Sequence, residues 1–287
     1  MKHAFAVRIG PVGFRIGSDW RAPIDTLRTL YRDYPEPDDA IPDLTVRLFA
    51  ARPWRRFVRP AVTIGGDFML PDALPLPLRL GVLAAEMGMN LQLALGWRRH
   101  LLLHAACVER DGKALLLTGE SGSGKSTLAA LLAADGWRLM GDEFALVDLV
   151  TGAIHAFPRL VSIKNAAIPV VERVVPAERR GPLLNDTPKG TLRHFVPDAA
   201  AVGAMATPAR AALLLFPSFG HDAAVRPMPA SETFVRLTQA STNYVALAEP
   251  GFAALTRLIV HVPTRAIDYP DTATALAQVA ALWDELA

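Results

Sequence analysis

Short runs in which apolar and polar residues alternate fill the first part of the chain. Such runs stand at residues 5–9, 12–16, 44–49 and 61–64, with Gly, Pro and Asp between them. Because successive side chains of a strand point to opposite faces, this alternation predicts β-strands. One stretch, residues 24–34, has apolar residues at helical spacing instead. We therefore predict a small, mainly β lobe of α+β type over residues 1–78.

From residue 79 to residue 287, predicted strands and helices follow one another in the order typical of an α/β domain. Apolar residues recur at helical spacing over residues 78–96, and we expect this helix to be buried against the second domain. Asp111 and Gly112 separate two apolar runs, which predicts an antiparallel hairpin. The other predicted elements are a helix at 125–134 ended by Gly136, strands at 138–140, 154–158, 161–164, 211–216 and 264–269, and helices at 231–240, 251–260 and 272–286.

The overall composition is that of a folded globular protein. Hydrophobic residues make up 51% of the 287 residues, enough for a sizeable core, and the formal net charge is only +2. This charge balance gives no reason to expect nucleic acid or a membrane surface as a partner. The single cysteine, Cys107, cannot form an internal disulfide, and no secretory signal is visible, so we expect a cytoplasmic protein.

A glycine-rich stretch, GESGSGKS at residues 119–126, has the spacing GxxxxGK followed by Ser or Thr. Glycines let backbone N–H groups turn inward around a polyphosphate, and the next helix presents its positive N-terminal end. A chance glycine-serine turn is the alternative, but this stretch follows an apolar run and opens a predicted helix. We therefore predict binding of ATP or GTP, with ATP as the expected cofactor, Lys125 on the phosphates and Ser126 on Mg²⁺. The predicted nucleotide-binding residues are Gly119, Glu120, Ser121, Gly122, Ser123, Gly124, Lys125, Ser126 and Thr127.

Two carboxylates, Asp142 and Glu143, come directly after the next predicted strand, the first of them 17 positions after Lys125. At the end of that strand both should lie near the mouth of the loop. One carboxylate could accept the proton of an acceptor hydroxyl while the other helps to hold the metal, as phosphoryl transfer to an alcohol requires. The alternative is an acidic turn without chemistry, which the neighbouring glycine-rich stretch makes less favoured.

Several other residues are candidates for weaker reasons. His104 stands between apolar neighbours in a predicted strand next to the one that feeds the glycine-rich stretch, so it is either a core histidine or a group near the γ-phosphate. Arg159, Lys164 and Lys189 lie in a Pro/Gly-rich region whose loops could close over a site and stabilise phosphate charge. Solvated cations are the alternative. A cationic and aromatic segment, residues 52–60, is interpreted as a solvated strand rather than a peptide or nucleic-acid surface.

The stretches HAACVERDGKALLLTGESGSGKSTL and GWRLMGDE resemble the catalytic core of the HPr kinase/phosphorylase family, and more closely its shorter relatives, the HPr kinase-related kinases. PRLVSIKN and DTPKGT are similar to motifs of that branch, and the resemblance extends over about residues 78–270. It implies a core of the P-loop type also similar to phosphoenolpyruvate carboxykinase. By position it implies that Asp142 is the proton-accepting carboxylate, His104 a phosphate-site histidine and Glu143 a metal ligand. A homo-oligomer is also implied as a possibility.

Together these features predict an ATP- and Mg²⁺-dependent kinase that phosphorylates a serine-type hydroxyl of a peptide, a small protein or a related acceptor. A kinase for a small metabolite is the second interpretation, and a short substrate pocket would favour it over an open groove. The third is a nucleotide-dependent binding or switch module without transfer, which the absence of a carboxylate near the γ-phosphate would support. No glycine-rich segment of the kind that recognises HPr is found in the sequence.

Overall fold

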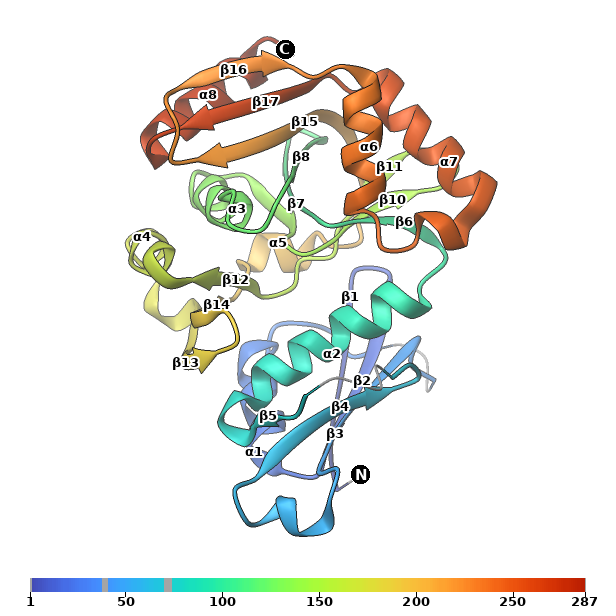
Figure 1. Cartoon of the computed structure of the whole chain (residues 1–287), viewed down its shortest axis with the longest axis vertical. Helices are drawn as coiled ribbons and strands as arrows, with labels where there is room; N and C mark the ends of the chain where they lie inside the picture. The colour runs from blue at the N-terminus through green and yellow to red at the C-terminus, as the bar shows by residue number, and fades with distance from the viewer. Residues whose placement is uncertain (1, 38–40, 70–73, 287) are drawn as a thin grey trace.

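The computed structural model describes residues 2–37, 41–69 and 74–286. Figure 1 shows a smaller body that contains the N-terminus and a larger body that ends in the C-terminal helix. Three sheets and the helices around them make up a mixed α/β architecture. The mixed class is confirmed, whereas the P-loop kinase type of core and the division of the chain after residue 78 stay predictions. Residues 1, 38–40, 70–73 and 287, which these two predicted domains include, lie outside the described residues.

The smaller body is built on a five-stranded sheet. Its strands, in spatial order, are β1 (His3–Ile9), β2 (Val12–Ser18), β3 (Leu44–Phe49), β4 (Ala61–Gly66) and β5 (Leu76–Pro77). The pairs are antiparallel except β2 with β3, which run parallel. The alternating runs of the sequence become strands whose apolar side chains face the core, as the fully buried Val7 and Ile9 of β1 and Val46 and Leu48 of β3 show.

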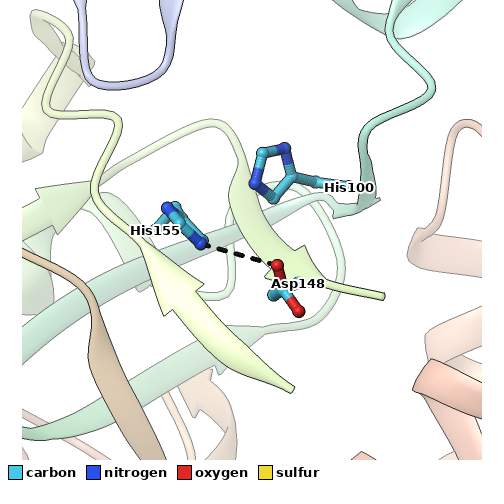
Figure 2. A group of neighbouring side chains, drawn as sticks. All are labelled: His100, Asp148 and His155. Atoms are coloured by element: carbon cyan, nitrogen blue, oxygen red, sulfur yellow. Dashed lines mark ion pairs between the residues drawn. The ribbon is translucent and has the colours of Figure 1, made fainter. Parts of the chain in front are cut away.

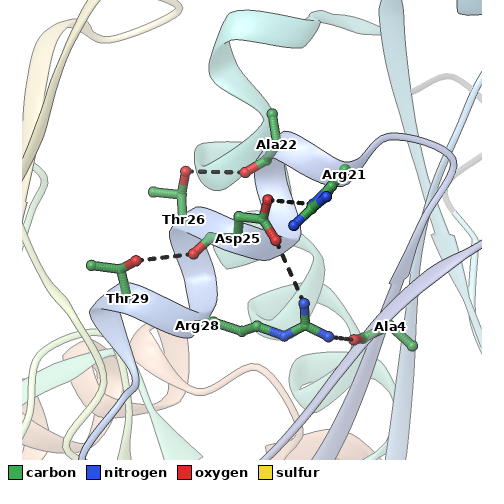
Figure 3. A network of polar contacts seen from close by, with 7 residues as sticks. All are labelled: Ala4, Arg21, Ala22, Asp25, Thr26, Arg28 and Thr29. Carbon is green, nitrogen blue, oxygen red and sulfur yellow. Dashed lines mark hydrogen bonds and ion pairs between the residues drawn. The ribbon is translucent and has the colours of Figure 1, made fainter.

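Helix α1 (Arg21–Leu30) packs its apolar stripe, including Ile24 and Leu27, against β1 and β2. Figure 3 shows its outer side, where Arg21 and Arg28 both pair with Asp25. Arg28 also donates to the carbonyl of Ala4 at 2.8 Å, which attaches the helix to the neighbouring strand (Figure 3). These exposed ion pairs each contribute only a few tenths of a kcal/mol, so burial of the apolar stripe holds α1 in place.

Helix α2 (Gly81–Gly96) packs mainly on β3 and β4 of the smaller body and contacts α1. The expectation that this helix is buried against the second domain is therefore correct only for one of its sides. A side chain at Gly88 would collide with Val46, so the glycine lets the helix lie close to the sheet. On the opposite side Glu86 and Asn90 reach Arg159 of the larger body. Because α2 is covered from both sides, apolar residues surround it.

The larger body is organised around a nine-stranded sheet. Its main path has the order β6 (His100–Leu103), β10 (Ala145–Asp148), β11 (Ala153–His155), β15 (Ala209–Phe219), β8 (Lys113–Thr118), β7 (Ala105–Arg110) and β9 (Arg138–Gly141). The far part of β15 also pairs with β17 (Thr264–Tyr269), which pairs with β16 (Ala224–Pro227). The predicted hairpin at Asp111 and Gly112 is confirmed as β7 and β8. Since β8 and β9 are both antiparallel to β7, they end at the same edge of the sheet.

Helices cover both faces of this sheet, which explains the unbroken leucine run of β8. Leu115 and Leu117 face a cluster formed with α3 (Lys125–Ala134) and α8 (Thr272–Asp284). Leu116 faces the opposite cluster, which contains residues of α6 (Ala230–Ala240) and α7 (Tyr244–His261). Among the described residues no helix combines the length and the apolar character that crossing a bilayer requires.

A third, three-stranded sheet lies beside the glycine-rich stretch, with the order β12 (Val161–Lys164), β14 (Gly190–Phe195) and β13 (Arg180–Thr187). Two short helices, α4 (Ile168–Glu172) and α5 (Ala199–Gly203), flank it. The sequence predicted β12 but not the hairpin of β13 and β14. The strand ends beside its turn contain Asp186 at a φ of 52° and Gly190 at a φ of 88°, and the pairing has register shifts. This irregularity hides the alternation on which the prediction of strands depends.

The predicted solvated strand at residues 52–60 is wrong. The segment contains a short 3₁₀ helix, η1 (Pro53–Arg56), and a bend after it. Trp20 donates its indole N–H to the carbonyl of Arg56 at 2.9 Å, and Arg56 donates back to the carbonyl of Asp19. Together with backbone bonds inside the segment, such as those from Phe57 and Val58 to the carbonyl of Trp54, these contacts hold it without a neighbouring strand.

Candidate active site

A cavity of about 460 Å³ lies at the edge of the large sheet where β8 and β9 end and α3 begins. It is lined by His104, Ser121, Gly122, Gly124, Lys125, Ser126, Thr127, Asp142, Glu143, Ser162, Ile163, Lys164, Asn165, Ala167 and Lys189. Most of the predicted site residues therefore share one cavity. Gly119, Glu120, Ser123 and Arg159, which were also predicted, do not line it.

The glycine-rich loop connects the end of β8 at Thr118 to the start of α3 at Lys125. Gly124 has a φ of 97°, and a Cβ atom there would lie 2.2 Å from the hydroxyl oxygen of Tyr269, so only glycine fits. Tyr269 donates that hydroxyl to the carbonyl of Ser123 at 3.0 Å, which fixes the loop against β17. The strand, loop and helix required by the phosphate-binding hypothesis are thus consecutive in the structure.

Lys125 is the first residue of α3 and is buried. Its ammonium group donates to the carbonyls of Gly119 at 2.8 Å and Glu120 at 2.7 Å. Burial lowers the pKa of Lys125 below its ordinary value, while the nearby carboxylate of Asp142 acts in the opposite direction. Gly119 and Glu120 therefore contribute to the cavity through the lysine that their carbonyls hold.

Asp142 follows β9 and is only 4% exposed. Its Oδ2 accepts a hydrogen bond from the amide of Ser162 at 3.1 Å, and its buried Oδ1 has no hydrogen-bond partner among the described residues. Burial, and then the charge of Glu143, raise the pKa of Asp142 to about 6, although Ser126 and the Ser162 amide oppose the rise. A carboxylate with this pKa and one free oxygen is suited to take a proton near neutral pH.

Glu143 and His104 lie next to each other in the lining of the cavity. His104 Nδ1 lies 3.7 Å from Glu143 Oε2, and burial lowers the pKa of the imidazole. The structure places His104 in a break between β6 and β7 rather than in the middle of a strand. There its amide donates to the carbonyl of Ala240 and its carbonyl accepts from Thr118, so the side chain is turned into the cavity wall.

Lys164 and Lys189 reach the cavity from the third sheet. Lys164 ends β12, and Lys189 lies in the turn between β13 and β14. Sequence reasoning missed Asn165, whose side-chain oxygen accepts from the amide of Thr191 at 3.0 Å and whose amide nitrogen donates to the Lys189 carbonyl at 3.3 Å. It also missed Ser162, which bonds Asp142. Both residues belong to or directly follow the predicted strand 161–164, and this is the signal that could have drawn attention to them.

Arg159 is not brought to the main cavity. The guanidinium is 3% exposed and pairs with the carboxylate of Glu86 and the side-chain oxygen of Asn90, both on α2. It lies instead in the wall of a neighbouring cavity of about 130 Å³. At this position Arg159 forms an ion pair between the two bodies, and the expected contact with phosphate is not made.

Two smaller cavities adjoin the main one from different sides. The first, about 180 Å³, is apolar, is lined partly by Leu128, Phe219 and Tyr269, and shares Gly122, Gly124, Thr127 and Ala167 with the main cavity. The second is the cavity beside Arg159, which shares Glu143, Ser162, Lys164 and Lys189 with the main cavity. No residue lines both small cavities. The three therefore follow one another, with the glycine-rich loop and the carboxylates in the middle.

A separate group of ligand-type side chains lies outside this lining, on the face of the large sheet (Figure 2). His155 Nε2 is 3.8 Å from Asp148 Oδ2, and His100 stands opposite Asp148 on the adjacent strand. Trp97 donates its indole N–H to His100 Nδ1 at 2.9 Å. The neutral imidazole of His100 then carries its proton on Nε2, so neither nitrogen has a free lone pair for a metal. We interpret the group as a structural cluster.

A family model described as SynChlorMet cassette protein ScmC matches residues 86–172, a stretch that contains the glycine-rich loop and the carboxylate pair. It differs from the HPr kinase-related family that the sequence resembles, so that assignment stays a prediction. No curated protein matches the chain. The Hpr(Ser) kinase/phosphatase from Coxiella burnetii matches with 16% identity over 64% of this chain and 98% of its own, but the TM-score of 0.30 is too low to assign a fold or an activity.

Proposed function

We propose that this chain is an ATP-dependent phosphotransferase that moves the γ-phosphoryl group to a serine-type hydroxyl of a peptide, a small protein or a small hydroxyl compound. One observation carries the proposal: a buried carboxylate with a free oxygen, Asp142, shares a cavity with the lysine and serine that begin α3. A phosphate cradle with a proton acceptor beside it is what transfer to an alcohol requires.

The adjoining apolar cavity supports a nucleotide as the phosphoryl donor. Its aromatic and aliphatic lining suits the faces of a nucleobase, and it reaches the main cavity at Gly122 and Gly124. A nucleotide whose base occupies this cavity would have its phosphates along the loop and its terminal phosphate toward Asp142. The cavity has few polar groups, and discrimination between ATP and other nucleotides is therefore expected to be weak.

The residues present also fit a magnesium ion. Mg²⁺ prefers oxygen ligands, and the hydroxyl of Ser126, the carboxylate of Glu143 and the unpartnered Oδ1 of Asp142 belong to the same cavity. We propose that Ser126 and Glu143 hold the metal. When bound, Mg²⁺ supplies charge neutralisation on the phosphates.

In the proposed reaction Asp142 accepts the proton of the acceptor hydroxyl as the oxygen attacks the γ-phosphorus. A new P–O bond forms to the acceptor, the bond between the γ-phosphorus and the bridging oxygen breaks, and its electron pair stays on the departing nucleoside diphosphate. Lys125, Lys164 and Lys189 supply positive charge around the transferring group, and His104 lies beside it. The raised pKa of Asp142 makes it a stronger base than an ordinary carboxylate at neutral pH.

The alternative of a binding or switch module without transfer is weaker because two carboxylates line the proposed phosphate cavity. The experiment that separates the possibilities measures nucleotide binding by calorimetry and transfer of labelled phosphate to peptides, HPr and small alcohols. We expect wild-type protein to bind Mg²⁺-ATP and label at least one acceptor. Lys125→Met should weaken ATP binding at least tenfold, whereas Arg173→Met, an exposed cation outside the cavity, should not. Binding without any transfer would favour the switch module.

A further inference from the structure

The cavity beside Arg159 differs in chemistry from the rest of the site. It is enclosed by α2 on one side and by the hairpin of β13 and β14 on the other, and the two walls belong to different bodies. Arg79, which precedes α2, donates to the carbonyl of Asn185 at 2.9 Å and pairs with Asp186, so the hairpin is held against the smaller body. The two walls therefore form a defined pocket that adjoins the main cavity and shares no lining residue with the apolar cavity.

The polar groups of this pocket divide into a closed set and an open set. Glu86, Asn90 and Arg159 are bonded mainly to one another at its base. Lys164 and Lys189 form no hydrogen bond or ion pair with a carboxylate among the described residues, although Glu143 also lines the pocket, and the buried Nε–H of Arg159 has no hydrogen-bond partner there. Since Glu86 pairs with Arg159, the two lysines face one carboxylate, Glu143, and the pocket lining carries one positive charge in excess. An anionic group is the ligand that would compensate this charge.

The size of the pocket limits what can enter. Its volume of about 130 Å³ is close to that of an engineered protein cavity of about 150 Å³ that holds benzene, so it accommodates about six or seven non-hydrogen atoms. Leu83 and Met87 of α2 and Leu192 of β14 supply apolar contact. A compound the size of one amino acid fits in such a volume entirely, whereas only a single side chain of a peptide or protein could enter it.

On these grounds we propose that the pocket is the acceptor subsite and that the acceptor is a small hydroxy acid. Its carboxylate lies between Lys164 and Lys189, and its hydroxyl points through the shared wall at Glu143 and Ser162 toward Asp142. This inference rests on the proposed phosphotransferase function and narrows its acceptor. The product is the phosphate monoester of the hydroxy acid; the hydroxyl proton passes to Asp142, and the nucleoside diphosphate leaves with the electrons of the broken bond.

The first test compares acceptors that differ only in the carboxylate. Wild-type protein is incubated with Mg²⁺-ATP and either glycerate or glycerol, and either L-serine or L-serinamide, with an acetylated serine peptide as a further acceptor. We expect kcat/KM at least tenfold higher for each carboxylate than for its uncharged counterpart, and no detectable transfer to the peptide. In Lys189→Met the ratio of the two kcat/KM values should fall at least fivefold. A lysine that served only the phosphates of ATP would lower both values equally and leave the ratio unchanged.

The second test fills the pocket from α2. Met87 is 43% exposed, so Met87→Trp should fold, and it should raise KM for the hydroxy acid at least tenfold while the Kd for nucleotide stays unchanged. Leu95→Trp, an exposed position on the same helix outside the pocket, is the control. Transfer to peptides but not to hydroxy acids, or an unchanged KM in Met87→Trp, would overturn the subsite while the phosphotransferase function stands. Absence of nucleotide binding in the wild type would overturn both.

Discussion

Two buried carboxylates, Glu86 and Asp142, show how differently this molecule treats the same chemical group. Both residues are only 4% exposed, and they line adjoining cavities. Glu86 meets the guanidinium of Arg159 and accepts the hydroxyl of Tyr31 at 2.8 Å. Asp142 has one amide partner, an unpartnered oxygen and a second carboxylate as its sequence neighbour.

The difference separates a structural site from a chemical one. Glu86 lies in a complete set of partners that connects α2 to the larger body, and its charge is compensated by a cation. Asp142 lies in an incomplete set, and its raised pKa of about 6 records the free energy cost of keeping it charged there. Groups held in this unfavourable state concentrate at functional sites, so the comparison itself points to Asp142. Substitutions at the two positions should therefore have opposite effects on stability.

The largest effect is expected on turnover. Asp142→Asn keeps the shape and the acceptor for the Ser162 amide but removes the base, so kcat for phosphoryl transfer should fall about a thousandfold. Nucleotide affinity should change less than threefold. Steady-state kinetics and calorimetry on the same preparation measure both, and Arg173→Met, outside the cavities, serves as the comparison. A variant that keeps more than a tenth of wild-type kcat would show that Asp142 is not the base.

The next effect concerns stability at Glu86. Glu86→Gln leaves the buried guanidinium of Arg159 without a counter-charge, and the free energy of unfolding should fall by about 4 kcal/mol. Urea denaturation measures the change. The double variant Glu86→Leu with Arg159→Met removes both charges and should recover most of the loss. If the single variant is as stable as wild type, the ion pair does not hold the two bodies together.

A gain in stability is expected at the other carboxylate. Because the folded-state pKa of Asp142 is raised from 3.8 to about 6, the folded protein binds the proton more tightly than the unfolded chain, and stability is lost as pH rises through this window. At pH 7 Asp142→Asn should therefore be more stable by about 3 kcal/mol in the absence of nucleotide and metal. The gain should disappear near pH 4. Thermal unfolding of both proteins at the two pH values tests this, and an unchanged or lowered stability of the variant at pH 7 would contradict it.

The half of the site that the sequence predicted is local along the chain. The hairpin of β7 and β8, the glycine-rich loop and Asp142 all fall within residues 104–143. Each of these features has a short-range signal in the sequence: an Asp-Gly turn, glycines that adopt positive φ, or a polar pair directly after an apolar strand. Since β8 and β9 run in the same direction on either side of β7 and end at one edge of the sheet, these signals were enough to place the residues together.

The other half of the site depends on contacts between distant segments. Arg159 could not be distinguished from a phosphate ligand because its partner, Glu86, lies 73 positions away. Apolar residues are distributed around all sides of helix α2, so its sequence pattern does not predict which body it packs on. The turn that presents Lys189 is closed by Thr187, but it is also bonded to Asn165, 24 positions earlier. Such pairings follow from how the two bodies pack, which no local pattern records.

The smallest expected effect concerns His100, a buried group that is charged when protonated, unlike the two carboxylates compared above. Burial and the neighbouring His155 lower its pKa from 6.5 to about 4, and Asp148 acts in the opposite direction. Between these values the unfolded chain binds the proton and the folded protein does not, so stability falls as pH decreases from 6.5 to 4. Relative to His100→Gln, which does not titrate, wild-type protein should lose about 2 kcal/mol more of its unfolding free energy between pH 7 and pH 5. Urea denaturation at both pH values measures the slope, with His221→Gln, a substitution of an exposed histidine, as the control. If the unfolding free energy depends on pH equally in wild type and in His100→Gln, the pKa of His100 is the same in the folded and unfolded protein. Burial would then not determine the charge state of His100.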